Sequence, residues 1–417
     1  MLSTLKPLMG AAGAGFAVAA IQMAMVVLAA RTLDIALYGV FALALGLANL
    51  LAEIGTAGLP VLANRILARY GARGHGARIA QFIAHGDGVV IRVTAIGLVL
   101  LGAGALLLAP DAPVAAQALV VTAILLPGVM FRLLRRHQLA GLGHPALAAV
   151  VETGLAATAG IAALLAGGGL MELALAYGAG SLAGAALAGR VTGRWRGVSR
   201  AKPRVDDRLR AVWWRAALPM WLAAGGTALF GRIDLVMIGP LAGTTEAGLY
   251  AAAIRLTYLI GIFAQIGLPI FWPLIAREAG TSRRVHATDL RYVAITGGIG
   301  GLAAIALWTA APQVVTLVFG ASYGAAAPIL RILCAAQLSA LFVTALTGSM
   351  LMRGQGRAYA PVMAGGLALG VALNLALIPP MGAIGAAWAT LATSLAMLIA
   401  LLVRGASVIG PARKDAP

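Results

Sequence analysis

A few ionisable residues fall inside long apolar stretches of the sequence, where they are the first candidates for chemistry. They are Glu53, Arg92, Glu152, Arg232, Asp234 and Arg255. A charge in the core of a membrane is costly unless it is paired or wetted, so such residues often mark the path of a substrate or an ion. Guanidinium groups stay charged and bind phosphate through two hydrogen bonds. Anion binding is therefore expected at Arg255, Arg232 and Arg92. Ion coupling or charge compensation is expected at Asp234, Glu53 and Glu152.

Each of these residues also has a structural interpretation. Arg92 lies close enough to the end of its apolar stretch for the head group to reach the membrane interface. Asp234 can be the counter-ion of Arg255 instead of a proton or cation site. Glu53 can form a helix-packing hydrogen bond, and Glu152 can be solvated near the end of its stretch. The sequence leaves these alternatives open.

The composition indicates a membrane protein. Hydrophobic residues make up 61% of the 417-residue chain and charged residues 11%, and the mean hydropathy is +0.95. About 20 apolar residues in a helix cross a bilayer core of ~30 Å. Twelve such stretches occur, at 9–30, 37–60, 88–109, 114–131, 146–166, 171–189, 213–240, 247–272, 290–311, 326–350, 358–378 and 382–403. The first is too long for the apolar core of a signal peptide. We predict an all-α integral membrane protein with twelve transmembrane helices.

Basic residues alternate between the gaps that separate these stretches. The even-numbered gaps hold Arg65, Arg69, Arg73, Arg78, Arg132, Arg135, Arg136, Arg190, Arg210, Arg277, Arg283, Arg284, Arg353 and Arg357, among others. The odd-numbered gaps hold Asp34, Asp111, Glu172 and Glu246, with Arg31 as the clear exception. Because cytoplasmic loops retain Arg and Lys, both termini are predicted to be cytoplasmic. On this topology, three of the candidate residues lie toward the outer half of the membrane, namely Arg232, Asp234 and Arg255. The other three lie toward the cytoplasmic half, namely Glu53, Arg92 and Glu152.

The net charge of +18 does not indicate nucleic-acid binding. The basic residues are dispersed through loops, where they set the topology and favour anionic lipid headgroups. The single cysteine, Cys334, excludes an intrachain disulfide. The charge pattern therefore predicts membrane lipids as partners and no nucleic acid.

The chain is expected to consist of two halves. A long basic gap at 190–212 separates an N-terminal six-helix bundle at 1–189 from a C-terminal one at 213–403, which a cytoplasmic tail at 404–417 follows. A shift of 212 residues aligns Asp34–Tyr38 with Glu246–Tyr250 and Arg65 with Arg277. A repeat with an even number of spans inserts twice in the same orientation, so the bundles should be related by a pseudo-two-fold axis along the membrane normal. A water-filled cleft is expected between the halves.

Several phrases of the sequence resemble those of polysaccharide flippases. They are Leu37-Tyr38-Gly39, Arg232-Ile233-Asp234, Glu246 to Ala253, Phe319 to Tyr323, Pro328 to Leu333 and Gly385 to Thr390. These flippases move O-antigen and exopolysaccharide units. They belong to the multidrug/oligosaccharidyl-lipid/polysaccharide (MOP) exporter superfamily, with multidrug extruders and lipid II flippases. Together the phrases cover most of the chain, and the family's usual twelve to fourteen spans agree with the count above.

The resemblance implies transport of a polyprenyl-diphosphate-linked glycan across a bacterial inner membrane by alternating access, with no cofactor. A polysaccharide polymerase or assembly protein is a possible partner, and a proton or sodium gradient is a possible source of energy. The alternative within the superfamily is a cation-coupled multidrug exporter. Cationic drugs call for carboxylates in the cleft, whereas a lipid diphosphate calls for arginines, and the arginines within the spans favour the anionic substrate.

An enzyme is not expected. A membrane-embedded polymerase or glycosyltransferase would need a catalytic site, but the odd-numbered gaps are too short to form one. The histidines, His75, His85, His137, His144 and His286, show no metal-ligand spacing. No phosphate-binding loop motif for ATP is present. No catalytic residue, metal site or cofactor is therefore predicted.

Overall fold

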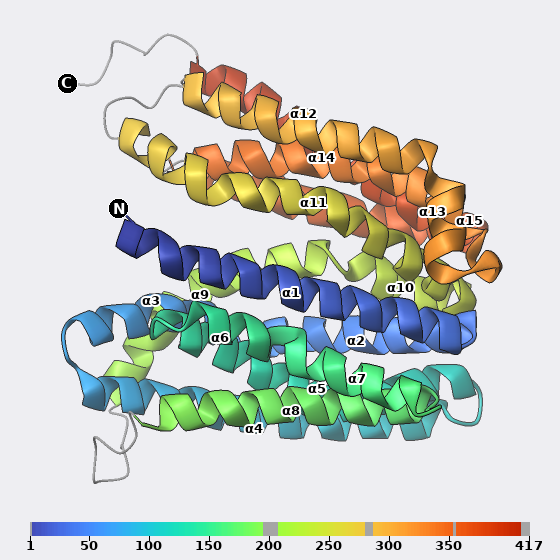
Figure 1. The fold of residues 1–417 in the computed structure, drawn as a ribbon, viewed down its shortest axis with the longest axis horizontal. Helices are drawn as coiled ribbons and strands as arrows, with labels where there is room; N and C mark the ends of the chain where they lie inside the picture. The colour runs from blue at the N-terminus through green and yellow to red at the C-terminus, as the bar shows by residue number, and fades with distance from the viewer. Residues whose placement is uncertain (1, 195–206, 280–286, 353–355, 410–417) are drawn as a thin grey trace. The chain divides into compact units, whose positions relative to one another are not determined.

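The computed structural model describes residues 2–194, 207–279, 287–352 and 356–409, and these residues fold into helices without any strand (Figure 1). The chain divides into two compact units, Met1–Arg232 and Ile233–Pro417. We call them the first unit and the second unit. The all-helical prediction is confirmed for the described residues.

The described residues of the first unit form a series of helices. They are α1 (Leu2–Thr32), α2 (Ile35–Gly55), α3 (Leu59–Ala72), α4 (Gly76–Leu108), α5 (Pro113–Gly141), α6 (Pro145–Ala149), the π-helix η1 (Val150–Gly154), α7 (Leu155–Leu165), α8 (Leu170–Gly193) and α9 (Asp207–Phe230). Helix α5 packs against α2, α3, α4 and α8, so it is the central helix of this unit. Asp34 begins α2, where its carboxylate accepts a hydrogen bond from the Ala36 amide at 3.3 Å.

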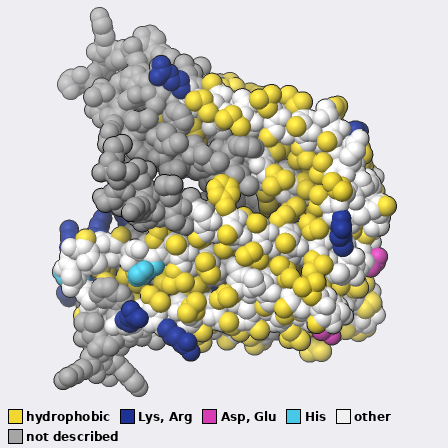
Figure 2. Space-filling view, viewed as in Figure 1, with side chains coloured by type: hydrophobic (Ala, Val, Ile, Leu, Met, Phe, Trp, Pro, Cys, Tyr) yellow, Lys and Arg dark blue, Asp and Glu magenta, His cyan; other side chains and the backbone are white. Residues whose placement is uncertain are grey.

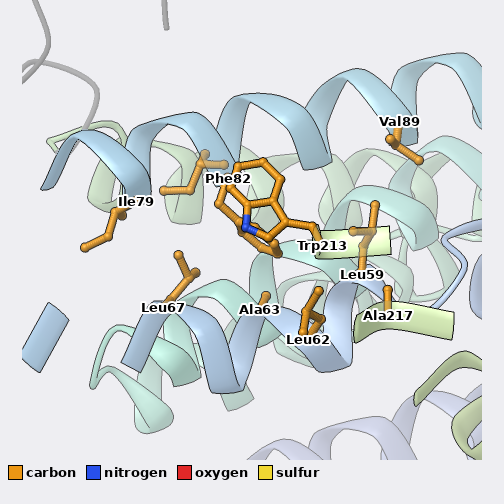
Figure 3. Packing of buried hydrophobic residues seen from close by; sticks show 10 residues of the cluster. Leu59, Leu62, Ala63, Leu67, Ile79, Phe82, Val89, Trp213 and Ala217 are labelled. Atoms are coloured by element: carbon orange, nitrogen blue, oxygen red, sulfur yellow. The ribbon is translucent and has the colours of Figure 1, made fainter. Parts of the chain in front are cut away.

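Helix α9 belongs to the first unit because its aromatic residues pack against α3 and α4. The Trp213 side chain is fully buried, and its ring meets that of Phe82 edge-on at a centroid distance of 5.0 Å. Figure 3 shows this indole among the apolar side chains of α3 and α4. Further along α9, the Trp221 indole donates to the carbonyl of Ile54 at the end of α2, at 2.9 Å.

The break between α2 and α3 requires a glycine. Gly58 has a φ of +76°, which disfavours residues with a side chain, and it approaches α9 closely. A Cβ at this position would come within 2.6 Å of the Ala217 carbonyl oxygen. Gly58 therefore precedes α3, which begins at Leu59-Pro60, and its missing side chain lets α9 approach closely.

The second unit consists of α10 (Ile233–Ala242), α11 (Thr244–Ala279), α12 (Ala287–Thr309), α13 (Ala311–Phe319), the 3-10 turn η3 (Ala321–Tyr323), α14 (Ala326–Met352) and α15 (Gly356–Ile409). Helix α14 packs against α11, α12 and α15, and α10 packs against α11 and α15. Helix α15 changes direction at Gly382, which follows Pro379 and Pro380 and has a φ of +58°. The Glu246 carboxylate of α11 accepts a hydrogen bond from the Ala383 amide at 2.8 Å and so caps the helix that restarts after this kink.

The helices agree with a multi-pass membrane protein. Among the described residues, nine helices are long and apolar enough to cross a bilayer, and one of these, Tyr359–Arg404, spans the two predicted stretches 358–378 and 382–403 except for residue 358. The stretch at 213–240 is divided between α9 and the short helix α10. Large apolar side chains such as Leu106 and Leu317 are exposed, and hydrophobic atoms dominate the described surface seen in Figure 2. The count of twelve and the cytoplasmic termini remain predictions.

The predicted linker falls between two observed helices. Helix α8 ends at Gly193 and α9 begins at Asp207, and residues 195–206 lie outside the described part of the chain. The compact units divide later, after Arg232, because α9 packs with the first unit. The two-bundle organisation and its pseudo-two-fold axis remain predictions.

Candidate functional site

Three of the predicted site residues, Glu53, Glu152 and Arg232, belong to the first unit, where the charges of Arg232 and Glu152 act on Glu53. Arg136 of α5 donates a hydrogen bond to the Glu152 carboxylate of η1 and forms an ion pair with it. The two side chains are 39% and 40% exposed. The Glu53 carboxyl at the end of α2 lies within electrostatic reach of Arg232, Arg136 and Glu152. The sequence predicts Arg232 in the outer half of the membrane and Glu53 in the cytoplasmic half, whereas in the structure the charge of Arg232 acts on Glu53.

Arg132 lies one helical turn before Arg136 on α5 and contacts residues of three other elements. Its guanidinium donates to the Glu152 carbonyl at 2.6 Å, to the Tyr177 hydroxyl at 3.2 Å and to the Asn49 side-chain oxygen at 3.1 Å. It also lies 5.7 Å from the centroid of the Tyr177 ring. The residue is only 5% exposed. Helices α2, α5 and α8 and the π-helix η1 therefore share one buried cation, whose described contacts are all neutral.

The π-helix η1 presents Glu152 to both arginines. A π-turn interrupts the regular hydrogen-bond ladder of the surrounding helix and redirects its carbonyl groups. The Glu152 carbonyl contacts Arg132 and its carboxylate contacts Arg136, which lies one turn further along α5. We call Glu53, Arg132, Arg136, Glu152 and Arg232 the first-unit polar site.

A second buried arginine supports this region. Arg135 forms an ion pair with Asp87 of α4 at 2.9 Å and donates to the Gln138 side-chain oxygen at 2.7 Å. It also reaches Thr192 of α8 at 3.5 Å. The assignment of Arg132 and Arg135 to a solvated loop was wrong. Helix α5 continues to Gly141, so both residues lie on it and point into the unit.

Asp234 is the centre of a different site in the second unit. This residue is 4% exposed. Its carboxylate accepts hydrogen bonds from the Leu235 amide at 2.8 Å, from the Thr390 hydroxyl at 3.3 Å and from the Tyr250 hydroxyl. Tyr250 comes from α11 and Thr390 from α15, so the site joins three helices. We call Asp234, Tyr250 and Thr390 the second-unit polar site.

The other predicted arginines lie apart from these contacts. Arg255 is partly buried on α11, with its guanidinium 5.5 Å from the centroid of the Tyr258 ring. Within the described residues, Asp234 contacts neutral donors and not Arg255. Arg92 is exposed on α4 and donates to the Gly88 carbonyl of its own helix at 3.0 Å. Arg255 and Arg92 therefore present charges that aromatic or backbone groups hold in place.

The two polar sites have different chemical capacities. The first-unit polar site contains three arginines and two glutamates, so it favours an anion, and its Arg136–Glu152 pair is accessible to water. The second-unit polar site is a buried carboxylate among hydroxyl and amide donors, which leaves one negative charge for a proton or a small cation to balance. Among the described residues, no group of three or more His, Cys, Asp and Glu residues could hold a metal ion.

The fold is that of membrane transporters of the MOP superfamily. An inward-facing multidrug resistance MATE family transporter of this superfamily matches with a TM-score of 0.74 at 15% identity, over 95% of this chain and 96% of its own. The lipid II flippase MurJ in an inward closed conformation matches with a TM-score of 0.77 at 12% identity, over 94% of this chain and 87% of its own. The eukaryotic MATE transporter AtDTX14 matches with a TM-score of 0.61 at 14% identity, over 98% of both chains.

The sequence match is more specific than the fold. Residues 11–277 match the model of the family described as polysaccharide biosynthesis protein, and the chain belongs to this family. None of the curated proteins matches the chain significantly. The resemblance found in the sequence phrases is thereby confirmed at the level of the family, and the fold agrees with it.

Proposed function

We propose that this protein is a flippase that moves polyprenyl-diphosphate-linked oligosaccharide units across the bacterial inner membrane for surface polysaccharide or O-antigen synthesis. The observation that carries the proposal is the family match over residues 11–277 in a chain that has the fold of a lipid II flippase. The mechanism is alternating access, and the protein transports its substrate without changing it chemically. A polysaccharide polymerase or assembly protein would then receive the translocated unit.

The arginines at Arg255, Arg232 and Arg92 are proposed to bind the diphosphate of the substrate. Two observations support this role. Arg255 is partly buried, and among the described residues its guanidinium contacts the face of Tyr258 and no carboxylate, which suits binding of an anion. Arg232 belongs to a site where arginines outnumber glutamates. An extruder of organic cations, by contrast, would be expected to expose carboxylates to its substrate.

Asp234 is proposed to couple transport to a proton or sodium gradient. Its carboxylate is buried among neutral donors, so binding of a cation would change the charge of the site and its hydrogen bonds together. Because these donors come from α11 and α15, ion binding at Asp234 would alter the packing of three helices. Glu53 and Glu152 are weaker candidates for coupling, since Arg136 and Arg232 already act on them.

Deletion of the gene in its native host tests the substrate. Radiolabelled polyprenyl-diphosphate glycans and surface polysaccharide are followed while wild type, Arg255→Gln or the control Arg331→Gln is supplied back. Arg331 also lies on an aromatic ring, Trp308, at 5.4 Å from its centroid, and donates to the Trp308 carbonyl at 3.3 Å, so its variant loses at least as many described contacts. We expect lipid-linked units to accumulate without the protein and with Arg255→Gln, but not with Arg331→Gln. If both pools stay unchanged while sensitivity to cationic compounds rises, the protein is a multidrug exporter instead.

Proteoliposomes with an imposed proton or sodium gradient test the coupling. Asp234→Asn keeps the shape of the side chain and an oxygen for Tyr250, but it removes the charge. We expect this variant to lose stimulation by the gradient while it still exchanges substrate down its concentration difference. The exposed residue Asp34 supplies the control, Asp34→Asn, which should respond to the gradient like wild type. A gradient response that persists in Asp234→Asn would refute the coupling role.

A further inference from the structure

The first-unit polar site contains a buried positive charge that no carboxylate side chain contacts among the described residues. All the described hydrogen bonds of Arg132 go to a backbone carbonyl, a phenol and an amide oxygen. A buried ion is costly unless other groups compensate it, and neutral acceptors compensate it only in part. The positive potential of Arg132 therefore extends to its neighbours on α5, Arg135, which Asp87 balances, and Arg136.

Arg136 is accessible and its ion pair is weak. Both partners of the pair are nearly two-fifths exposed, and water screens such pairs so strongly that they contribute little. Glu152 itself is held in position by its carbonyl, which Arg132 binds, so its carboxylate can leave Arg136 without disturbing the π-helix. A ligand with more negative charge than one carboxylate can thus displace Glu152 from Arg136.

We propose that the Arg136–Glu152 pair is an exchangeable binding site for a diphosphate group. This inference rests on the proposed function, because a lipid-linked diphosphate is the ligand that a flippase of this class would have to bind and release. Two phosphates offer Arg136 the bidentate geometry that guanidinium prefers. The charges of Arg132 and Arg232 favour the anion, whereas the carboxylate that Glu152 withdraws and the nearby charge of Glu53 oppose it.

This balance of charges suits transport. A site that bound the diphosphate too tightly would hold it and slow the cycle. Glu152 competes with the ligand for Arg136, so the site returns to its ion pair when the substrate leaves. Arg132 acts as a positioning residue, because it contacts the Glu152 carbonyl and not the proposed ligand site. The same chemistry would accept a membrane phospholipid or free pyrophosphate, so the experiment must distinguish these sources.

Calorimetric titration of the full-length protein in phosphatidylcholine nanodiscs tests the site. The probes are farnesyl diphosphate, farnesyl monophosphate and inorganic pyrophosphate, and phosphatidylglycerol is added to the discs in a separate arm. We expect Arg136→Gln to weaken farnesyl diphosphate about tenfold, which corresponds to the loss of one charged contact. Glu152→Gln should strengthen binding about threefold, because Arg136 loses its competitor. Arg65→Gln, on the exposed face of α3, should match wild type.

The gain in affinity for Glu152→Gln is the decisive result, because misfolding cannot produce it. The double variant Arg136→Gln/Glu152→Gln should bind no more tightly than Arg136→Gln alone. Unchanged or weaker binding by Glu152→Gln would overturn the proposal and make the pair a structural contact. Equal binding of farnesyl monophosphate, or equal competition by phosphatidylglycerol, would also overturn it, because the site would then recognise any lipid phosphate. Binding of pyrophosphate with the same variant pattern would support recognition of the diphosphate itself.

The two proposals can fail separately. If wild type fails to move lipid-linked glycan but binds farnesyl diphosphate with the expected variant pattern, the flippase function is wrong and the diphosphate site stands. If wild type moves the glycan but Arg136→Gln and Glu152→Gln both bind farnesyl diphosphate like Arg65→Gln, the function stands and the site is wrong.

Discussion

The polar sites of the two units handle charge in opposite ways. In the first unit, Arg136 and Glu152 form an ion pair that water can reach. In the second unit, Asp234 is buried and its described contacts are neutral donors. A water-screened ion pair can change partners at a small cost in free energy. A buried carboxylate without a counter-charge is stabilised when a cation or a proton binds to it. The first arrangement suits recognition of an anionic substrate, and the second suits coupling to an ion.

A similar contrast exists within the first-unit polar site. Arg132 and Arg136 lie one turn apart on α5, but Arg132 is 5% exposed and contacts three other elements, while Arg136 is accessible and contacts one carboxylate. Burial and the number of partners, not residue type, therefore decide which arginine stabilises the fold. The second arginine is then free to take part in binding.

The largest effect is expected for Arg132→Met. Methionine fills a similar volume but leaves the Asn49 oxygen, the Tyr177 hydroxyl and the Glu152 carbonyl without their donor. Hydrogen bonds to a charged group contribute about 1.5–3 kcal/mol each, offset here by the cost of burying the ion, so we expect a loss of about 3 kcal/mol in the free energy of unfolding. Unfolding in mixed detergent micelles measures it.

The control for this variant is Arg65→Met on the exposed face of α3. Because its guanidinium is solvated, the control should unfold like wild type to within about 0.5 kcal/mol. If Arg132→Met is as stable as the control, or more stable, the free energy of the Arg132 hydrogen bonds does no more than offset the cost of burying the charge. The contrast between Arg132 and Arg136 would then lose its energetic basis.

Part of the candidate site could be predicted from the sequence. Ionisable residues in apolar stretches pointed to Glu53, Glu152 and Arg232, which all belong to the first unit, and to Asp234, which is buried in the second. The rule that such charges are costly in lipid identifies them without any knowledge of their partners. The repeat offset also pairs Tyr38 with Tyr250, and both side chains are buried.

The partners of these residues could not be predicted. Arg132 follows the end of an apolar stretch and so counted as a loop residue, although the absence of glycine and proline between Arg132 and Gly141 indicates that the helix continues. Its contact with Asn49 spans 83 positions, and that of Asp234 with Thr390 spans 156. Contacts between residues so far apart in the sequence depend on how the helices pack. Because these helices are apolar on all sides, the sequence does not show which faces contact one another.

The next largest effect is expected in the second-unit polar site, for Tyr250→Phe. The phenylalanine ring fits the same space but cannot donate a hydrogen bond to the buried Asp234 carboxylate. The carboxylate still accepts hydrogen bonds from the Thr390 hydroxyl and the Leu235 amide. Loss of one hydrogen bond to a charged group should lower the free energy of unfolding by about 2 kcal/mol. Adding Asp234→Asn to this variant should recover part of the loss, because a neutral side chain needs the hydroxyl less. A double-mutant cycle in the same unfolding assay measures the coupling. Additive effects would mean that the carboxylate is not charged in the folded state.

A smaller effect is expected for Glu246→Ala, which removes the cap of the helix that restarts at Ala383. The loss should be about 1 kcal/mol, a typical value for a helix cap. Glu172 offers a matched comparison in the first unit, because its carboxylate accepts from the Gly169 amide at the start of its own helix, α8, at 2.9 Å. Glu246 instead joins α11 to α15. Hydrogen exchange should therefore show loosening of residues after Gly382 in Glu246→Ala, and only of the first turn of α8 in Glu172→Ala. Loosening confined to α11 would contradict the long-range cap.

The smallest effect on stability is expected for Arg136→Gln. A site whose ion pair opens to admit a ligand requires that this pair contribute little to folding. A pair that is about 40% exposed contributes no more than about 0.5 kcal/mol, because the gain from attraction is offset by desolvation and lost side-chain freedom. Unfolding in mixed micelles at low and high salt checks this value, and salt should have little effect on the variant. A loss as large as that of Arg132→Met would mean that Arg136 is fixed by the fold and unable to change partners. Near-wild-type stability together with weakened diphosphate binding would instead separate the two arginines by role, one holding the π-helix and the other contacting the substrate.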